Sequence, residues 1–381
     1  MKKHGIKRPE AKASEPSTDK PNDFHRKNRV EKTGIEMQNQ DEAIKTTLDN
    51  EHKNIKEIAK KFSKRDINHM YLIGCGDSWF INIGVRYALE SLLGITCEAI
   101  EAQDFNLYHH IPVDEKSAVI GISSSGSTSA VINSLSTAYD KGAFVIGVSN
   151  TKDAGILSDY DAGLYIDAVR EGWPTQASTA AMSALTLLGI EIAKAKGTNK
   201  AEAEKLFLEL KEIPKKVKEV FNRHNEEMKK LAKELYLTTF IKLTGCGSNY
   251  AAAAFGAAKI KELCPIDAEA MHLEEFHHYR TLRENDVFFL VAPDGPSLKR
   301  ALDTAKVGRY DGGKIYSIVS DNEEEISNVS HQTFNIPEVD ERLAPILYSI
   351  PLHQFAYHLA MAKFDNNVGY PGSFMESTDN E

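Results

Sequence analysis

Short apolar runs alternate with stretches of helical periodicity along most of this chain. Candidate strands lie at about residues 70–74, 97–102, 118–122, 144–149 and 163–166, and again at 240–244, 266–270, 287–292, 315–320 and 333–336. Candidate helices lie at 40–62, 79–93, 128–141, 177–195, 200–235, 250–263 and 345–363. Strands that alternate with helices favour parallel sheets with helical crossovers. The pattern predicts an α/β fold of two doubly wound, flavodoxin-like parallel-sheet domains in tandem.

A six-residue frame occurs twice, once in each half of the chain. The copies are Gly74-Cys75-Gly76-Asp77-Ser78-Trp79 and Gly245-Cys246-Gly247-Ser248-Asn249-Tyr250. Each follows an apolar run and precedes a helical pattern, so each is expected to form a tight turn into a helix. Such a turn places backbone N–H groups and a hydroxyl at a helix N-terminus, which favours anions. Gly76, Asp77, Ser78 and Ser248 are therefore candidate contacts to a small anionic ligand.

The first 40 residues are polar, rich in Lys and interrupted by Pro, which predicts a disordered leader. The rest of the chain has room for two domains, 41–215 with N-terminal helices and 216–381 with a C-terminal tail. No apolar stretch approaches the roughly 20 residues that span a membrane. The net charge of −9 disfavours nucleic acid as a partner. Four cysteines in so long a chain do not suggest a disulfide framework, which favours a cytoplasmic location.

Five hydroxyl side chains occur within the six residues Ser123-Ser124-Ser125-Gly126-Ser127-Thr128, between a predicted strand and a predicted helix. Open α/β sheets bind ligands at such positions, and N–H groups and hydroxyls together hold a phosphate without a cation. A single serine there is more often an ordinary helix cap, but this density favours the phosphate site. The P-loop alternative lacks its lysine at position 127, and the nucleophile elbow lacks its glycine at position 125.

Glu262 is expected in the last turn of an Ala-rich helix, because Pro265 disfavours helix just before it. The negative end of the helix dipole and partial burial both raise the pKa of a carboxyl group there, as a general base near neutrality requires. The alternative is a solvated glutamate beside Lys259 and Lys261.

A cluster of histidines follows, His272, His277 and His278, with Glu274 and Glu275 between them. Its spacing matches no zinc motif, so no metal and no other cofactor is expected. A histidine that acts as acid or base on a sugar ring oxygen is the more plausible function.

Together these motifs resemble the sugar isomerase (SIS) family over about residues 36–370. The similarity is to the isomerase half of glucosamine-6-phosphate synthase, to fructosamine-phosphate deglycases and to glucosamine-6-phosphate deaminases. Residues 36–44 are similar to the segment that opens this isomerase unit, and residues 123–128 to its phosphate loop. The resemblance implies two SIS domains in tandem, a homodimer with sites built across subunits, and a sugar phosphate as the partner.

The resemblance also implies roles for individual residues. Glu262 corresponds to the family's catalytic glutamate, which moves a proton between C1 and C2 through an enediol or enolamine. His278, sixteen residues further on, corresponds to the catalytic histidine that helps to open the sugar ring. The implied substrate contacts are Gly76, Asp77, Ser78, Ser123, Ser124, Ser125, Thr128, Ser178 and Ser248.

The expected function is that of an enzyme acting on a 6-phosphorylated amino sugar or fructosamine, in which aldose–ketose isomerisation is coupled to deamination or deglycation. A simple phosphosugar isomerase and a sugar-phosphate-binding regulator without catalysis remain alternatives. The regulator is disfavoured because Glu262 and His278 occur together at the family spacing. The synthase also carries a Schiff-base lysine near its C-terminus, and no lysine follows Lys363 here. This favours a free amine, ammonia or no nitrogen chemistry at all over an imine with the enzyme.

Overall fold

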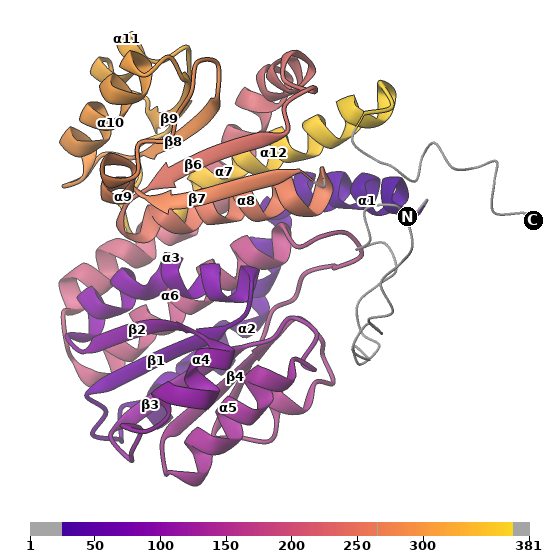
Figure 1. The fold of residues 1–381 in the computed structure, drawn as a ribbon. Helices are drawn as coiled ribbons and strands as arrows, with labels where there is room; N and C mark the ends of the chain where they lie inside the picture. Colours follow the sequence, from indigo (N-terminus) through magenta and orange to yellow (C-terminus); the bar gives the residue numbers. More distant parts are fainter. Residues whose placement is uncertain (1–24, 265, 369–381) are drawn as a thin grey trace, which may run out of the picture.

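The computed structural model describes residues 25–264 and 266–368 and contains two α/β domains built on one plan (Figure 1). The first sheet has the order β2-β1-β3-β4-β5, with β1 (His69–Gly74), β2 (Thr96–Glu101), β3 (Ser117–Ile122), β4 (Phe144–Ser149) and β5 (Ala162–Tyr165). The second has the order β10-β9-β8-β6-β7, with β6 (Phe240–Gly245), β7 (Asp267–His272), β8 (Val287–Ala292), β9 (Lys314–Ser320) and β10 (Gln332–Ile336). All paired strands are parallel, so the predicted fold is confirmed.

The central strands form as they do because their apolar runs are buried on both faces of the sheet. Every residue of β3 and of β4 is buried, as expected for a parallel sheet covered by helices on each side. β1 pairs with both β2 and β3, so the strand order reverses between β1 and β3. The crevice outside the carboxyl ends of these two strands is where open α/β sheets bind ligands. The repeated turn and the hydroxyl loop both begin there.

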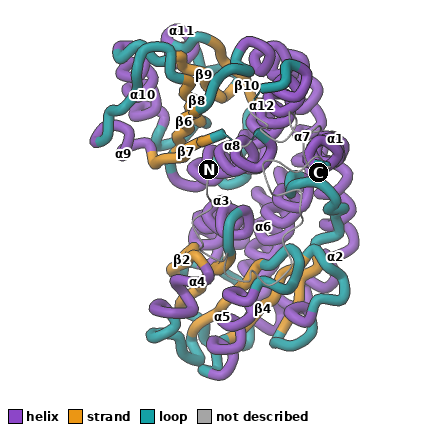
Figure 2. Tube along the Cα trace, turned by 45° about the vertical axis from the view of Figure 1, so that its right-hand side comes forward, coloured by secondary structure: helices purple, strands orange, loops and turns teal. Residues whose placement is uncertain are grey.

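A helical layer separates the two sheets, as Figure 2 shows. It contains α3 (Asp77–Leu93) and α6 (Gln176–Lys196) from the first half and α8 (Tyr250–Leu263) from the second, and α3 contacts both of the others. Gly84 lets these helices approach closely, since a Cβ there would be 3.0 Å from Met182 Sδ in α6 and 3.4 Å from Ala251 Cβ in α8. The C-terminal part of α8 reaches the first domain, where Lys259 hydrogen-bonds Asp77 at the start of α3.

The remaining helices lie on both faces of the two sheets: α2 (Gln40–Phe62) and α12 (Ala344–Asp365) share the inner core with α3, α6 and α8. The outer face of the first sheet carries α4 (Ala102–Asp104), a π-helical turn (Phe105–His109), α5 (Ser129–Asp140) and a 3-10 turn (Gly155–Leu157). The outer face of the second sheet carries α9 (Leu273–His278), α10 (Leu298–Tyr310) and α11 (Glu325–Val329), and a 3-10 turn (Gly247–Asn249) follows β6. No helix of the described residues has both the length and the hydropathy that a membrane span needs.

The predicted disordered leader is wrong for residues 26–38, which form α1 (Arg26–Gln38). This helix packs against α12, with Val30 and Met37 buried and Gly34 against the ring of Tyr357. The helix α1 was not predicted because it has few apolar residues. Tertiary contacts, rather than a strong apolar stripe, stabilise it. Residues 1–24 of the leader lie outside the described residues.

The expected domain boundary after residue 215 lies within α7 (Lys200–Glu234). This helix runs unbroken through that position and packs against α2 and α6 of the first half and against α12 of the second. The division into 41–215 and 216–381 therefore stays a proposal, with α7 as an element shared by both domains.

Candidate active site

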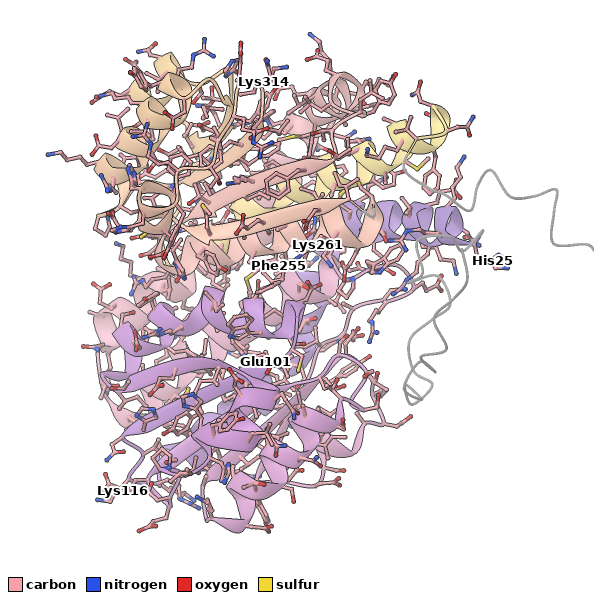
Figure 3. All side chains as sticks on the ribbon, in the orientation of Figure 1. His25, Glu101, Lys116, Phe255, Lys261 and Lys314 are labelled. Carbon is pink, nitrogen blue, oxygen red and sulfur yellow. The ribbon has the colours of Figure 1, made fainter. Side chains whose placement is uncertain are left out.

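A cavity of about 510 Å³ lies at the carboxyl ends of β1 and β3 and extends to the last turn of α8. It brings together seven of the predicted residues, Gly76, Asp77, Ser78, Ser124, Ser125, Thr128 and Glu262. Figure 3 labels Lys261, which also lines the cavity, at the junction of the two domains. Two further cavities of similar size border α1, and the described residues that line them include none of the predicted site residues.

The hydroxyl loop presents part of its polar side chains to the cavity and uses the rest to hold its own shape. Ser123 is 2% exposed and does not line the cavity; its hydroxyl shares a hydrogen bond of 2.9 Å with that of Thr128. The Ser125 and Ser127 hydroxyls share another of 2.9 Å. Gly126 has φ +69°, which only glycine adopts readily, and it packs against Ala154. A side chain at this position would therefore be strained and would also clash with Ala154. Ser124, Ser125 and Thr128 are therefore the residues of the loop that line the cavity.

The first copy of the repeated frame forms the second wall. Gly76 has φ +56° and lets α3 start at Asp77, so the positive end of the α3 dipole faces the cavity. Cys75 lines the cavity too, and its thiol donates a hydrogen bond of 3.0 Å to Glu101 Oε1. Burial, reinforced by Glu101, raises the pKa of Cys75 to about 12, so this thiol is a poor nucleophile.

Ser178 and Ser248 take different positions. Ser178 Oγ is buried in the first turn of α6, without a hydrogen-bond partner among the described residues. It lines a cavity of about 30 Å³ that shares Asp77, Ser78 and Ser124 with the large one, so it lies next to the site. Ser248, from the second copy of the frame, is also buried but lines neither cavity. The structure thus brings Ser178 near the predicted site and leaves Ser248 outside it.

A buried lysine links the two domains beneath the cavity. Lys259 is fully buried, and its Nζ donates a hydrogen bond of 2.6 Å to Asp77 Oδ2 and another to Glu262 Oε2. Burial disfavours the charged lysine, but the two carboxylates outweigh this and raise its pKa. Lys259 is therefore an ammonium that joins the start of α3 to the end of α8. From the sequence, Lys259 was expected only as a neighbour of a solvated Glu262.

Glu262 has the electrostatic surroundings of a base that works near neutrality. Its side chain is 32% exposed, and it faces the cavity. Burial raises its pKa to about 7; Lys259 opposes this rise, and the negative charge of Asp77 adds to it. A carboxylate with this pKa both accepts and returns a proton at neutral pH. A raised pKa was predicted from burial and the helix dipole. In the structure, burial raises the pKa, and the ion pair with Lys259 opposes the rise.

Sequence reasoning missed the arginines of the cavity. Arg26 and Arg29 extend from α1 and Arg170 from the segment after β5, and all three line the cavity. The guanidinium carbons of Arg29 and Arg26 lie 4.1 and 4.8 Å from the ring centroid of Trp173. Arg170 donates a hydrogen bond of 3.1 Å to Ser124 Oγ. Two of these residues lie in the predicted leader, where basic residues were read as disorder.

His278 does not lie at the cavity of its own chain. It ends α9 with its side chain 66% exposed, and its nearest acidic partner is Glu274, 4.0 Å away. The other histidines have separate neighbours: His277 bonds Thr304 Oγ1 at 2.9 Å, and His272 stacks on Tyr250. The described residues include no group of three or more His, Cys, Asp or Glu side chains arranged to hold a metal. The expectation that no metal is needed stays a prediction.

Comparison with known proteins identifies the fold and its relatives. Two stretches, residues 64–190 and 234–363, match the model of the SIS domain. A glutamine–fructose-6-phosphate aminotransferase of Aquifex aeolicus is 30% identical over 319 residues, which are 83% of this chain and 52% of that protein. The chain therefore spans about half the length of the curated relatives it matches.

Solved structures share the fold. The C-terminal domain of glucosamine-fructose-6-phosphate aminotransferase from Francisella tularensis superposes with a TM-score of 0.79 at 23% identity, covering 87% of this chain and 96% of that one. A glucosamine-6-phosphate deaminase of Thermotoga maritima superposes with a TM-score of 0.69 at 18% identity, covering 87% and 95%.

Proposed function

The chain belongs to the SIS domain family, and we propose that it is an isomerase-type enzyme of 6-phosphorylated amino sugars or fructosamines. One observation carries this proposal: a single cavity joins the hydroxyl loop to the carboxylate of Glu262, whose pKa burial raises to about 7. The names of the relatives, a glutamine–fructose-6-phosphate aminotransferase and a glucosamine-6-phosphate deaminase, support the same substrate class.

In this proposal the phosphate rests on the hydroxyls of Ser124, Ser125 and Thr128 and at the N-terminus of α3. Hydroxyls and backbone N–H groups bind a phosphate by charge-assisted hydrogen bonds. Arg170 lies beside Ser124 and adds a positive charge at this end. The sugar carbons then extend from the loop toward Glu262, past Ser78 and the small cavity of Ser178.

Glu262 moves the proton in this proposal. With a fructosamine, its carboxylate takes a proton from C1 and returns it to C2, which converts the enolamine into an imine at C1. Water splits that imine into a hexose 6-phosphate and the free amine. With glucosamine 6-phosphate the proton moves from C2 to C1, and water splits the resulting imine at C2 into fructose 6-phosphate and ammonia. Lys259 and Asp77 hold the carboxylate in place and set its pKa, without contact to the reacting carbons.

The proposal includes a cytoplasmic homodimer in which His278 of a second copy faces the cavity. Within one chain, His278 is exposed on α9 and lies away from Glu262 and the hydroxyl loop. Opening of the sugar ring needs a proton donor at the ring oxygen, and a histidine has a suitable pKa range for this task. A two-fold arrangement brings the same pair of surfaces together twice and completes two equal sites.

The test is an incubation with a panel of 6-phosphates in which ammonia, free amine and hexose phosphate are all assayed. The panel contains glucosamine 6-phosphate, fructosamine 6-phosphates, glucose 6-phosphate and fructose 6-phosphate. Release of amine or ammonia together with hexose phosphate is the expected result. Interconversion of the plain hexose phosphates alone shows a simple isomerase, and tight binding of a sugar phosphate without any product shows a regulator.

A further inference from the structure

A second cavity, of about 470 Å³, lies where α1 and the start of α2 meet the segment 167–171 that follows β5. None of the described residues lines both this α1–α2 cavity and the active-site cavity. Its volume lies within the range of roughly 300 to 1,000 Å³ that is usual for small-molecule sites. The function proposed above makes no use of it.

A buried carboxylate on the wall of the α1–α2 cavity has one oxygen without a partner. Glu36 lines the cavity and is only 3% exposed. Its Oε1 accepts hydrogen bonds from the backbone N–H groups of Glu171 and of Gly172, the latter at 2.8 Å. Its Oε2 is buried and has no hydrogen-bond partner among the described residues. Because a buried carboxylate oxygen without a donor costs free energy, a donor is expected to reach it from the cavity.

The charge of the lining favours a cation as that donor. The lining contains four carboxylates and one ammonium: Glu36, Glu42, Asp167, Glu171 and Lys32. Lys32 pairs with Glu171 at 3.0 Å, and both side chains are well exposed. The other three carboxylates therefore have no cation among the described residues that line the cavity. Negative charge of this kind in a concave surface attracts cationic ligands.

Apolar side chains lie between these charges. Ile35 on α1 and Val169 after β5 both line the cavity and are 61% and 62% exposed. An aliphatic chain that covers them removes apolar surface from water, which is favourable. A bare metal ion gains nothing from such walls, and the part of the chain that the structure describes has no three His, Cys, Asp or Glu side chains arranged to hold one. The lining thus suits a cation that carries an aliphatic chain.

We propose that the α1–α2 cavity binds an aliphatic primary amine in its ammonium form, which donates to Glu36 Oε2 and lays its chain against Ile35 and Val169. A primary ammonium has three N–H donors on one atom, so it bonds a single carboxylate oxygen and keeps donors for Glu42 and for water. Alkylammonium groups of this kind keep their charge at neutral pH. This site is separate from the sugar-phosphate site and opposite to it in charge, so neither proposal depends on the other.

The test compares two ligands of nearly equal shape, n-hexylammonium and 1-hexanol, by ligand-observed NMR titration of the full chain at neutral pH and constant ionic strength. We expect hexylammonium to bind at one site, roughly 10-fold to 100-fold more tightly than hexanol, as a charge-assisted hydrogen bond in a partly buried site allows. Glu36→Gln keeps an amide oxygen for the backbone N–H groups and replaces the other oxygen by NH₂, so it should bring this ratio close to one.

Two further variants complete the test. Glu31→Gln removes the same charge from α1 outside the cavity and is the matched control, with an unchanged ratio expected. Glu42 is exposed at the start of α2, so Glu42→Gln keeps the fold even where Glu36→Gln does not. It should weaken hexylammonium binding by about 2-fold to 5-fold, as an exposed charge does, and leave hexanol binding unchanged. Melting temperatures show which variants fold.

Four results overturn the inference. Equal binding of the amine and the alcohol is the first, and an unchanged ratio in every folded variant of Glu36 and Glu42 is the second. Glucose 6-phosphate should not displace hexylammonium, because displacement would place the amine in the active-site cavity. Displacement by Mg²⁺ at the same ionic strength would show a metal site instead.

Discussion

The two domains share one topology and differ in what they offer to a ligand. In the first, the loop after β3 presents hydroxyls to the cavity and turns at Gly126, which has a positive φ. In the second, the equivalent loop after β8 reads Pro293-Asp294-Gly295-Pro296-Ser297. The two prolines have no N–H group to donate. The carboxylates of Asp294 and Glu341 would repel an anion at this loop. A Cβ on Gly295 would be 2.7 Å from Glu341 Oε2, so that carboxylate lies directly against the loop.

The turns after β1 and β6 show the same division. Ser78 lines the cavity, whereas Ser248 is buried against the helical layer. The second domain instead contributes Lys259 and Glu262 from the end of α8. A repeated fold need not repeat its site: in the proposed function, one copy binds the anion, and the other supplies the base to its neighbour.

The largest effect is expected where the second domain acts on the first. Glu262→Gln keeps the shape of the side chain and removes the base, so turnover should fall by roughly 10²-fold to 10⁴-fold with little change in substrate affinity. Exchange of the substrate's C2 proton with deuterated water should be lost as well. Glu275→Gln, on α9 and outside the cavity, is compared in parallel and should behave as the native protein. Native-rate exchange in the Glu262 variant would mean that the base lies elsewhere, with Glu275 as the next candidate.

A smaller effect is expected in the phosphate loop, and only in the first domain. Ser125→Ala removes one hydrogen bond to a charged phosphate, which costs about 1.5 to 3 kcal/mol of binding free energy. The matched change Ser297→Ala in the second domain should leave affinity for a hexose 6-phosphate unchanged. Titration calorimetry on both variants decides the matter. Equal losses in the two would show that the second loop also binds phosphate.

Hybrid dimers test whether the second domain also acts across subunits. Glu262→Gln and His278→Asn are each expected to be inactive, but a mixture after subunit exchange should recover about a quarter of native activity. Half of the dimers are then hybrids, and each hybrid has one intact site. Each variant exchanged with itself is the control and should stay inactive. An equally inactive mixture, in a sample shown to contain hybrids, would place His278 outside the shared site.

The smallest effect concerns pH. Because Glu262 acts as a base only when ionised, kcat/KM should rise with pH and reach half its maximum near pH 7, the pKa of this group. The negative charge of Asp77 contributes to the raised pKa, so Asp77→Asn should move the acid limb of the profile to lower pH. The pH profile of each protein measures this shift. A limb that moves upward would mean that Asp77 acts mainly by keeping the Lys259 ammonium charged and close to Glu262.

Local patterns were enough to predict the fold and much of the site. The strands lie within two residues of their expected positions, because apolar runs of that length are buried wherever parallel sheets form. The hydroxyl loop and the first turn were also predictable, since a glycine with positive φ at a strand-to-helix junction is a property of neighbouring residues. Glu262 was predicted as the base because it lies in the last turn of a helix. The helices α9, α10 and α11 were not predicted, because their apolar positions are few.

Only the tertiary structure decided which distant residues share the site. Lys259 and Asp77 are 182 positions apart, and nothing near either of them indicates that a buried ion pair joins the two domains. Arg26 and Arg29 looked like part of a basic leader until α1 was found packed beside Trp173. His278 matched a motif by spacing, yet it lies away from the cavity of its own chain. The sequence determined backbone geometry, which depends on adjacent residues, whereas the charges that meet at the cavity depend on how helices far apart in the chain pack together.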